Sequence, residues 1–244
     1  MTRRSGFTLA EVLITLGIIG VVAAMTIPNL IANTNGAKFR SQFKKTVSTL
    51  NQAGLMAQAQ YDFDYAGTDA TADCSASSHP EEVMSFCSIL NGTLTGQTFI
   101  GAGNNLKRNA NGTEVVYSWV RATTLTTPAD YTTYSLADGS IVGFKTGAGG
   151  CELPIGTQMT DAVIEGALAN CVGFIDVNGV TLPNKEVRCT DTSKQTKAAM
   201  LKVQEPCAVK NDANNMTDVF PIVFHDATVE PASAPAKYVL TSSK

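Results

Sequence analysis

Glu11 is the residue whose type and position most directly suggest chemistry, because it is the one charged side chain in an apolar run of 25 residues, Phe7 to Ile31. Coiled into a helix, this run would rise roughly 37 Å, which is enough to cross a bilayer. An ionisable group inside such a segment is costly and needs a partner. We therefore expect Glu11 either to pair with a positive group from outside the run or to reach toward the membrane interface.

The cysteines form a second reactive set. Six cysteines lie beyond the apolar run, none of them forms a CxxC pair, and the chain has only two histidines. These features disfavour zinc and catalytic-thiol sites, and an even, scattered set is typical of disulfides formed in an oxidising compartment. Six cysteines allow 15 pairings, among which we favour neighbours in sequence: Cys74 with Cys87, Cys151 with Cys171, and Cys189 with Cys207.

Two further acidic residues raise the question of a metal. Asp176-x-Asn178-Gly179 resembles a fragment of a calcium loop, and Asp218 could complete an oxygen cluster. An Asn-Gly hairpin turn explains the same residues without a metal, and the remaining acidic ligands of a full loop are absent. We favour the turn and expect no cofactor, with calcium as the alternative.

The remaining sequence does not indicate an enzyme or a nucleic-acid-binding protein. The formal net charge is −3, without the basic excess that nucleic-acid binding requires. There is no nucleophile elbow, and no Gly-rich loop follows a strand and opens a helix. His225-Asp226, next to Phe224, indicates the end of a strand rather than half of a catalytic dyad.

Processing of the N-terminus is open to three interpretations, of which two are general. Signal peptidase would cut after the apolar core, and Val22-Ala23-Ala24 is a small-x-small site whose use would release a soluble secreted binding module starting at Met25. A plain membrane anchor would be oriented by flanking positive charge. That charge is ambiguous, because Arg3 and Arg4 are opposed by four residues after the run: Lys38, Arg40, Lys44 and Lys45. The disulfide argument places the cysteine-bearing part outside the cytoplasm.

The third interpretation accounts for both the short basic leader and Glu11 within the apolar run. The stretch Gly6-Phe7-Thr8-Leu9-Ala10-Glu11-Val12-Leu13 resembles the prepilin cleavage and methylation signature of type IV pilins and pseudopilins. The resemblance implies cleavage between Gly6 and Phe7 by prepilin peptidase, and N-methylation of Phe7. It also implies that Glu11 pairs with the N-terminal ammonium of a neighbouring subunit and that Gly20 and Pro28 loosen the helix.

The same resemblance implies a structural subunit of a type IV pilus or pilin-like filament. Its partners would be other pilin subunits, prepilin peptidase and an inner-membrane assembly platform. The chain would first be a single-pass inner-membrane protein with its C-terminal domain in the periplasm, and later part of a periplasmic or extracellular filament. Pilus, type II secretion and competence filaments all remain open.

The expected fold is α+β, a long N-terminal helix packed on an antiparallel sheet. We divide the chain into a leader (1–6), a transmembrane and filament-core helix (7–32), an amphipathic continuation (33–61), a loop-rich connector (62–114), a disulfide-containing sheet domain (115–229) and a C-terminal tail (230–244). The continuation should bury Phe39, Phe43, Val47, Leu50 and Leu55 or Met56, although Thr34-Asn35-Gly36 could break it. Pro28 should kink the first half.

Short elements complete the expectation. One short helix is predicted near Pro80 to Leu90. Strands are predicted where β-branched and aromatic residues lie between turn signals: Val115–Val120, Tyr131–Leu136, Ile141–Lys145, Val172–Val177, Phe220–Phe224 and Tyr238–Leu240.

Overall fold

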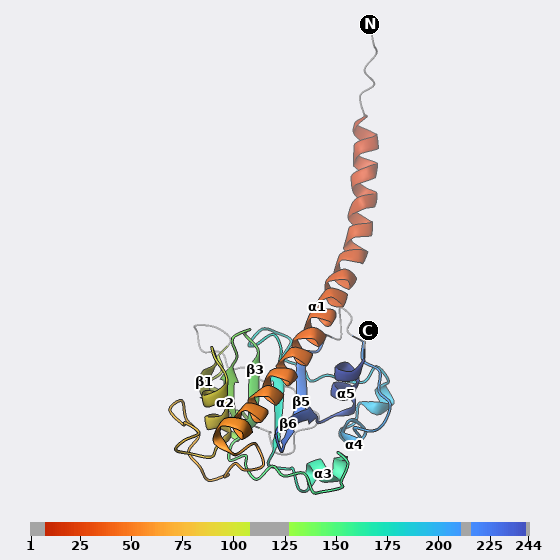
Figure 1. Ribbon diagram of the computed structural model, residues 1–244. Helices are drawn as coiled ribbons and strands as arrows, with labels where there is room; N and C mark the ends of the chain where they lie inside the picture. Colours follow the sequence, from red (N-terminus) through yellow and green to blue (C-terminus); the bar gives the residue numbers. More distant parts are fainter. Residues whose placement is uncertain (1–7, 108–126, 211–215, 243–244) are drawn as a thin grey trace.

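The structure, a computed structural model, describes residues 8–107, 127–210 and 216–242. Its longest element is helix α1 (Leu9–Tyr61), whose first half projects away from the rest of the chain while its second half lies across a β-sheet (Figure 1). We call everything from the second half of α1 onward the head. The arrangement confirms the α+β plan of a long N-terminal helix on an antiparallel sheet.

Both ends of α1 follow from local chemistry. At its start, the Thr8 hydroxyl accepts a hydrogen bond from the Glu11 backbone N–H, and the Glu11 carboxylate accepts one from the Thr8 backbone N–H. This reciprocal capping box satisfies two of the amides that a helix start leaves unpaired. At its end, Asp62 adopts a left-handed conformation with φ of 64° and donates its N–H to the Gln58 carbonyl.

The helix is continuous where the sequence left a break open. It passes through Thr34, Asn35 and Gly36 without interruption, and the Thr34 hydroxyl donates to the Leu30 carbonyl within the helix. Pro28 also lies inside α1, which is drawn as one curved helix in Figure 1. The low helix propensity of Thr34-Asn35-Gly36 is tolerated because the packed residues that follow hold the next turns of the helix in place.

The second half of α1 buries one face against the head. Phe39, Phe43, Val47 and Leu50 are buried as expected. The last two turns differ from the prediction, since Ala53 and Ala57 are buried whereas Leu55 and Met56 are exposed. Small side chains are needed here because the helix approaches the chain closely: a Cβ on Gly54 would lie 2.7 Å from the Ala227 carbonyl oxygen.

The sheet is a six-stranded antiparallel meander in which each strand pairs with its neighbours in sequence. Four strands coincide with expected ones: β2 (Tyr131–Ser135), β3 (Ile141–Lys145), β4 (Val172–Asp176) and β5 (Val219–His225). The edge strands β1 (Thr98–Ala102) and β6 (Thr228–Pro231) were not predicted. The strand expected at 115–120 lies outside the described residues.

The predicted strand at Tyr238–Leu240 is wrong, because these residues belong to helix α5 (Ala234–Thr241). The Ser233 hydroxyl caps this helix by accepting from the Ala236 N–H, and Pro235 lies in its first turn. Both are ordinary helix-start signals. The predicted short helix is present as α2 (Phe86–Thr93), which begins later than expected because Ser85 caps it.

Short elements connect these. Two are α-helices, α3 (Asp161–Glu165) and α4 (Lys197–Leu201). Three are 3₁₀ turns, η1 (Gly103–Asn105), η2 (Pro128–Asp130) and η3 (Thr192–Lys194).

An aromatic core joins α1, α2 and the sheet. Phe43 of α1 stacks on Phe220 of β5 with ring centroids 4.3 Å apart. Phe86 of α2 contacts Phe144 and Phe224 of the sheet at 5.2 and 5.0 Å. Aromatic contacts of this kind add to the large area that each ring buries, so α1 is held by its second half alone.

Three disulfides cross-link the head. They join Cys74 to Cys87, Cys151 to Cys171, and Cys189 to Cys207, which are the three pairs favoured from sequence order. The first ties the loop after α1 to α2, the second links the segment after β3 to the residue before β4, and the third lies within the insertion between β4 and β5. Each restricts a connection that has little regular structure of its own.

The core contact of α1 gives a stability prediction. Replacing Phe43 with Ala should lower the free energy of unfolding of the head by about 3–5 kcal/mol, because it removes a buried ring and leaves a cavity beside Phe220. Leu55→Ala, on the exposed side of the same helix, should change it by about 0.5 kcal/mol or less. Chemical denaturation followed by circular dichroism measures both, and equal losses would contradict the packing described.

Candidate functional site: the projecting helix and its neck

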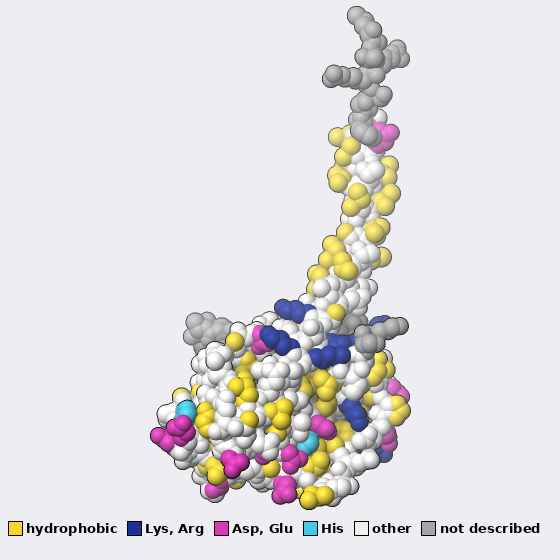
Figure 2. Space-filling model, viewed as in Figure 1, with side chains coloured by type: hydrophobic (Ala, Val, Ile, Leu, Met, Phe, Trp, Pro, Cys, Tyr) yellow, Lys and Arg dark blue, Asp and Glu magenta, His cyan; other side chains and the backbone are white. Residues whose placement is uncertain are grey.

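The projecting half of α1 is apolar around its whole circumference. Its large side chains are more than half exposed at most positions, including Leu9, Leu13, Ile18, Met25 and Leu30. Figure 2 shows them covering the helix beyond the head. Within the described residues, α1 is the one helix long and apolar enough to cross a membrane. A helix that is apolar all round needs an apolar environment, which this chain does not supply by itself.

Glu11 lies at the outer end of this helix. Its carboxylate accepts hydrogen bonds from the Thr8 backbone N–H and the Thr8 hydroxyl, both at 2.8 Å, and the side chain is exposed. Among the described residues, the acid is therefore bonded within its own first turn, and its side chain remains exposed. Gly6 and Phe7, the residues of the expected cleavage site, lie outside the described residues.

The glycines of the apolar half are not required by packing within the chain. A Cβ added at Gly17 or Gly20 would meet nothing within 4 Å. Pro28 is likewise on an exposed part of the helix. Since no contact inside the chain explains these residues, their effect is on the helix itself or on what packs around it.

Positive side chains gather at the neck, which we define as α1 from Asn33 to Lys45 together with the head residues beside it. Figure 2 shows Lys and Arg concentrated here, while Asp and Glu lie mostly toward the far end of the same face. Between Glu11 and Asp62, α1 carries no acidic residue. Lys45 pairs with Asp138 at 3.2 Å. The sequence indicated the positive charge that follows the apolar run as an orientation signal. The fold adds Lys210, which lines the same pocket as Arg40 and Lys44.

The residues proposed for calcium form backbone caps. The Asp176 carboxylate accepts from the Asn178 N–H at 3.2 Å, as in a turn. The two carboxylate oxygens of Asp218 accept from the Asn184 and Lys185 N–H groups at 3.0 and 2.8 Å. Over the part of the chain that is described, no three His, Cys, Asp or Glu side chains gather as a metal site would need. The arrangement supports the turn.

Asp218 is nevertheless in an unusual state. Its side chain is buried, and burial raises its pKa to about 6, although the N–H groups of Lys185 and Asn184 favour the charged form. Desolvation outweighs these hydrogen bonds. The Asp218 carboxyl group therefore holds Asn184 and Lys185, which follow the cis Leu182-Pro183 bond, against the start of β5. Ionisation of the buried carboxyl group lowers the stability of the folded state.

His225 shows no sign of catalysis. Its Nδ1 lies 3.0 Å from the Asp226 carboxylate, and it ends β5, as the sequence indicated. The ring is buried, with Glu230 on its other side at 3.9 Å. The pair is an ordinary strand end followed by the turn into β6.

The raised pKa of Asp218 predicts a pH effect. In the unfolded chain an aspartate titrates near 4, so the folded state holds the proton more tightly between about pH 4 and pH 6. This contribution to stability is full below pH 4 and is lost as the pH rises through 6. Asn cannot ionise, so Asp218→Asn removes this pH dependence. The free energy of unfolding of the variant, minus that of the natural chain, should therefore be higher at pH 7 than at pH 4 by roughly 2–3 kcal/mol. Urea unfolding at the two pH values measures the difference, and Glu81→Gln, on the exposed surface, is the control.

Comparison with known proteins concerns the N-terminal end of this helix. The family model described as the prokaryotic N-terminal methylation motif matches residues 1–27. Searches of curated proteins and of solved structures each gave no match. The motif marks structural subunits of the pilin class rather than enzymes. Residues 1–27 thus carry the N-terminal methylation motif that is the type IV pilin and pseudopilin signature.

Proposed function

We propose that this chain is a structural subunit of a type IV pilus or pilin-like filament. The observation that carries the proposal is the fully exposed apolar half of α1, which extends from a head stabilised by its own core and disulfides. Such a helix can lie in a bilayer first and then pack against the same helix of other subunits. Both environments would bury the surface that one chain leaves open.

Processing would occur between Gly6 and Phe7. A glycine before the cut presents an unhindered backbone to a peptidase working at the membrane surface. Cleavage there, rather than after the apolar run, leaves the whole of α1 on the mature subunit. The new amino group of Phe7, N-methylated after cleavage, would then lie four residues, or roughly 6 Å along a helix, from Glu11.

Glu11 would set the position of each subunit in the filament. Within the described residues its exposed carboxylate bonds to Thr8 of its own turn, and an ammonium from a neighbouring subunit can approach it. In a surrounding of low dielectric the attraction between two such charges is strong and falls steeply with distance. One axial position of the neighbouring helix is therefore preferred over all others.

Gly20 and Pro28 would allow part of α1 to loosen during assembly. Neither is held by a contact within the chain. Proline removes a helical hydrogen bond and glycine lowers the preference for helix, so the stretch between them is the weakest part of the exposed half. Unwinding there would let the filament lengthen without disturbing the head.

In the cell, the precursor would span the inner membrane once, with the head in the periplasm, where disulfides form. Prepilin peptidase and an inner-membrane assembly platform would be its processing partners. Other pilin subunits would be its permanent partners, in a heterologous contact repeated along a helix.

A second candidate is a soluble secreted binding module, cut by signal peptidase after Ala24. One observation favours keeping it: the packed part of α1 begins at Phe39, so a chain starting at Met25 would retain every core contact of the head. The two candidates differ in their N-terminal residue.

The N-terminal residue of the mature protein distinguishes the two candidates. Protein recovered from membranes and from sheared surface material should yield an N-terminal peptide with the mass of N-methyl-Phe7. Peptide mass spectrometry measures it directly. A peptide starting at Met25 would identify the secreted module and overturn the filament proposal.

The second prediction concerns Glu11. Glu11→Ala should leave membrane insertion and cleavage largely intact and strongly reduce filament yield, because the subunit loses the charge that fixes its position. Glu81→Ala, an exposed acid on the head, should assemble normally. Shearing and electron microscopy compare the two, and normal filaments from Glu11→Ala would show that its charge does not set the register.

A further inference from the structure

We infer that the neck contains a binding pocket for the phosphate of an anionic phospholipid headgroup. The pocket lies between α1, α5 and the segments around Val187 and Val209, with a volume of about 590 Å³. The inference rests on the proposed insertion of α1 into a membrane. It adds a ligand and a site that filament assembly alone does not require.

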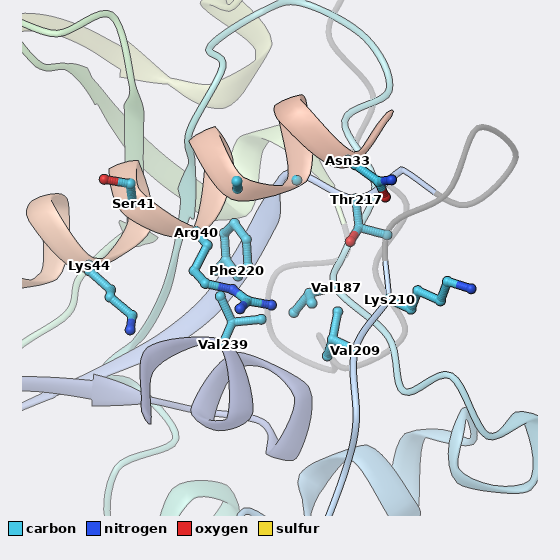
Figure 3. Close-up of a pocket in the computed structure, with 12 residues that line it drawn as sticks. Asn33, Arg40, Ser41, Lys44, Val187, Val209, Lys210, Thr217, Phe220 and Val239 are labelled. Carbon is cyan, nitrogen blue, oxygen red and sulfur yellow. The ribbon is translucent and has the colours of Figure 1, made fainter. Parts of the chain in front are cut away.

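The pocket is cationic. Its polar lining includes Arg40, Lys44 and Lys210, and none of the described residues that line it is acidic. In Figure 3, Arg40 extends from α1 toward Val187 and Val209, Lys44 points toward α5, and Lys210 points outward at the rim. Over the described parts of the chain, none of these three residues forms an ion pair with an acidic side chain.

Arg40 has a guanidinium nitrogen that the chain leaves unsatisfied. Its Nε is buried and has no hydrogen-bond partner in the described chain, which is costly for a charged group. Because Nε is closed off from solvent, an anion in the pocket would bind through the Nη groups of the same guanidinium, whose planar fork suits the several oxygens of a phosphate. Lys44 donates to the Ser242 carbonyl at 2.7 Å. That bond holds its ammonium at the pocket and leaves further N–H groups for an anion.

The end of the pocket nearest the apolar run lies at the depth of the headgroup layer. Asn33, Gly36 and Ala37 line this end and lie roughly 3–9 Å along the helix beyond Ile31, the last residue of the apolar run. A bilayer of 40–45 Å with a core of 30 Å has roughly 5–7 Å of headgroup on each side. Arg40 and Lys44 start farther out, roughly 14 and 20 Å beyond Ile31. Side chains on a helix lean toward its N-terminus, so Arg40 reaches back toward this layer from outside it.

The pocket also has an apolar floor. Val187, Phe220 and Val239 are buried beneath the cationic groups, with Val209 beside them. A small inorganic anion would leave this floor wet, whereas the glycerol and first methylenes of a lipid would cover it. The combination of apolar floor and cationic rim therefore favours a phospholipid over a free anion.

This site gives a reason for the charge that the orientation rule leaves unexplained. Positive residues normally flank a membrane segment on the cytoplasmic side, yet α1 carries four of them on the head side. Among the described residues, Lys45 is the one of these four that is paired with an acid. Basic residues near a membrane surface are attracted to anionic lipids. Held in this way, the head would stand at a defined height and angle before its subunit leaves the membrane.

Native mass spectrometry of the full chain in detergent tests the site. Three ligands are titrated: phosphatidylglycerol, phosphatidylcholine and inorganic phosphate. The natural chain should retain phosphatidylglycerol in preference to the other two. The double variant Arg40→Gln, Lys44→Gln should bind it roughly 10- to 30-fold more weakly. Lys194→Gln with Lys202→Gln removes the same charge away from the pocket and should bind as the natural chain does.

Several outcomes would overturn the inference. Equal retention of phosphatidylcholine, equal binding of inorganic phosphate, or equal losses in the two double variants would each show that no anionic headgroup is read by this pocket. Unchanged lipid binding with lost association between copies would assign the pocket to a second subunit instead. Flotation with vesicles distinguishes failure of the proposed function from failure of the pocket. A chain that does not insert into vesicles refutes the membrane anchor, whereas a chain that inserts without preference for anionic lipid refutes the pocket alone.

Discussion

The rest of the structure depends on one constraint, the apolar surface of the first half of α1, which nothing in its own chain covers. Exposed apolar area costs roughly 25 cal/mol per Å² in water, so this helix has a strong preference for a bilayer or for other copies of itself. The head meets the opposite requirement. It must fold without any contribution from that half. It does so because α1 packs into the core of the head from Phe39 onward, with Phe43 stacked on Phe220.

The neck is where these two requirements meet. A helix that is free on one side and held on the other transmits the position of the membrane to the head, provided the joint between them is stiff. Continuity through Thr34-Asn35-Gly36 and packing against α5 make it so. The positive charge and the pocket lie at this joint, so an interaction with headgroups or with a neighbouring subunit would act directly on the orientation of the head.

Sequence patterns located most of the fold and failed in physically informative places. The four central strands were found because β-branched and aromatic residues are buried there on both sides. Edge strand β1 was missed because its sequence, TFIGA, is interrupted by Gly101 at positive φ. The α5 residues Tyr238 to Leu240 have strand propensity, but the cap at Ser233 decides the backbone. Leu55 and Met56 fit the helical period, yet the buried side chains there are Ala53 and Ala57, on either side of the close approach of Gly54 to Ala227.

The sequence by itself determined the N-terminal motif, the apolar run and the position of Glu11, because each is local: the residues that matter are adjacent in the chain and their types alone define the property. Tertiary structure alone decided the neck pocket, since Arg40, Val187, Lys210 and Val239 are far apart in sequence and meet only when α1 lies across the sheet. It also decided the state of Asp218, whose pKa is set by burial against a segment more than thirty residues away. Burial and proximity between distant segments are properties of the packed chain, and no local pattern encodes them.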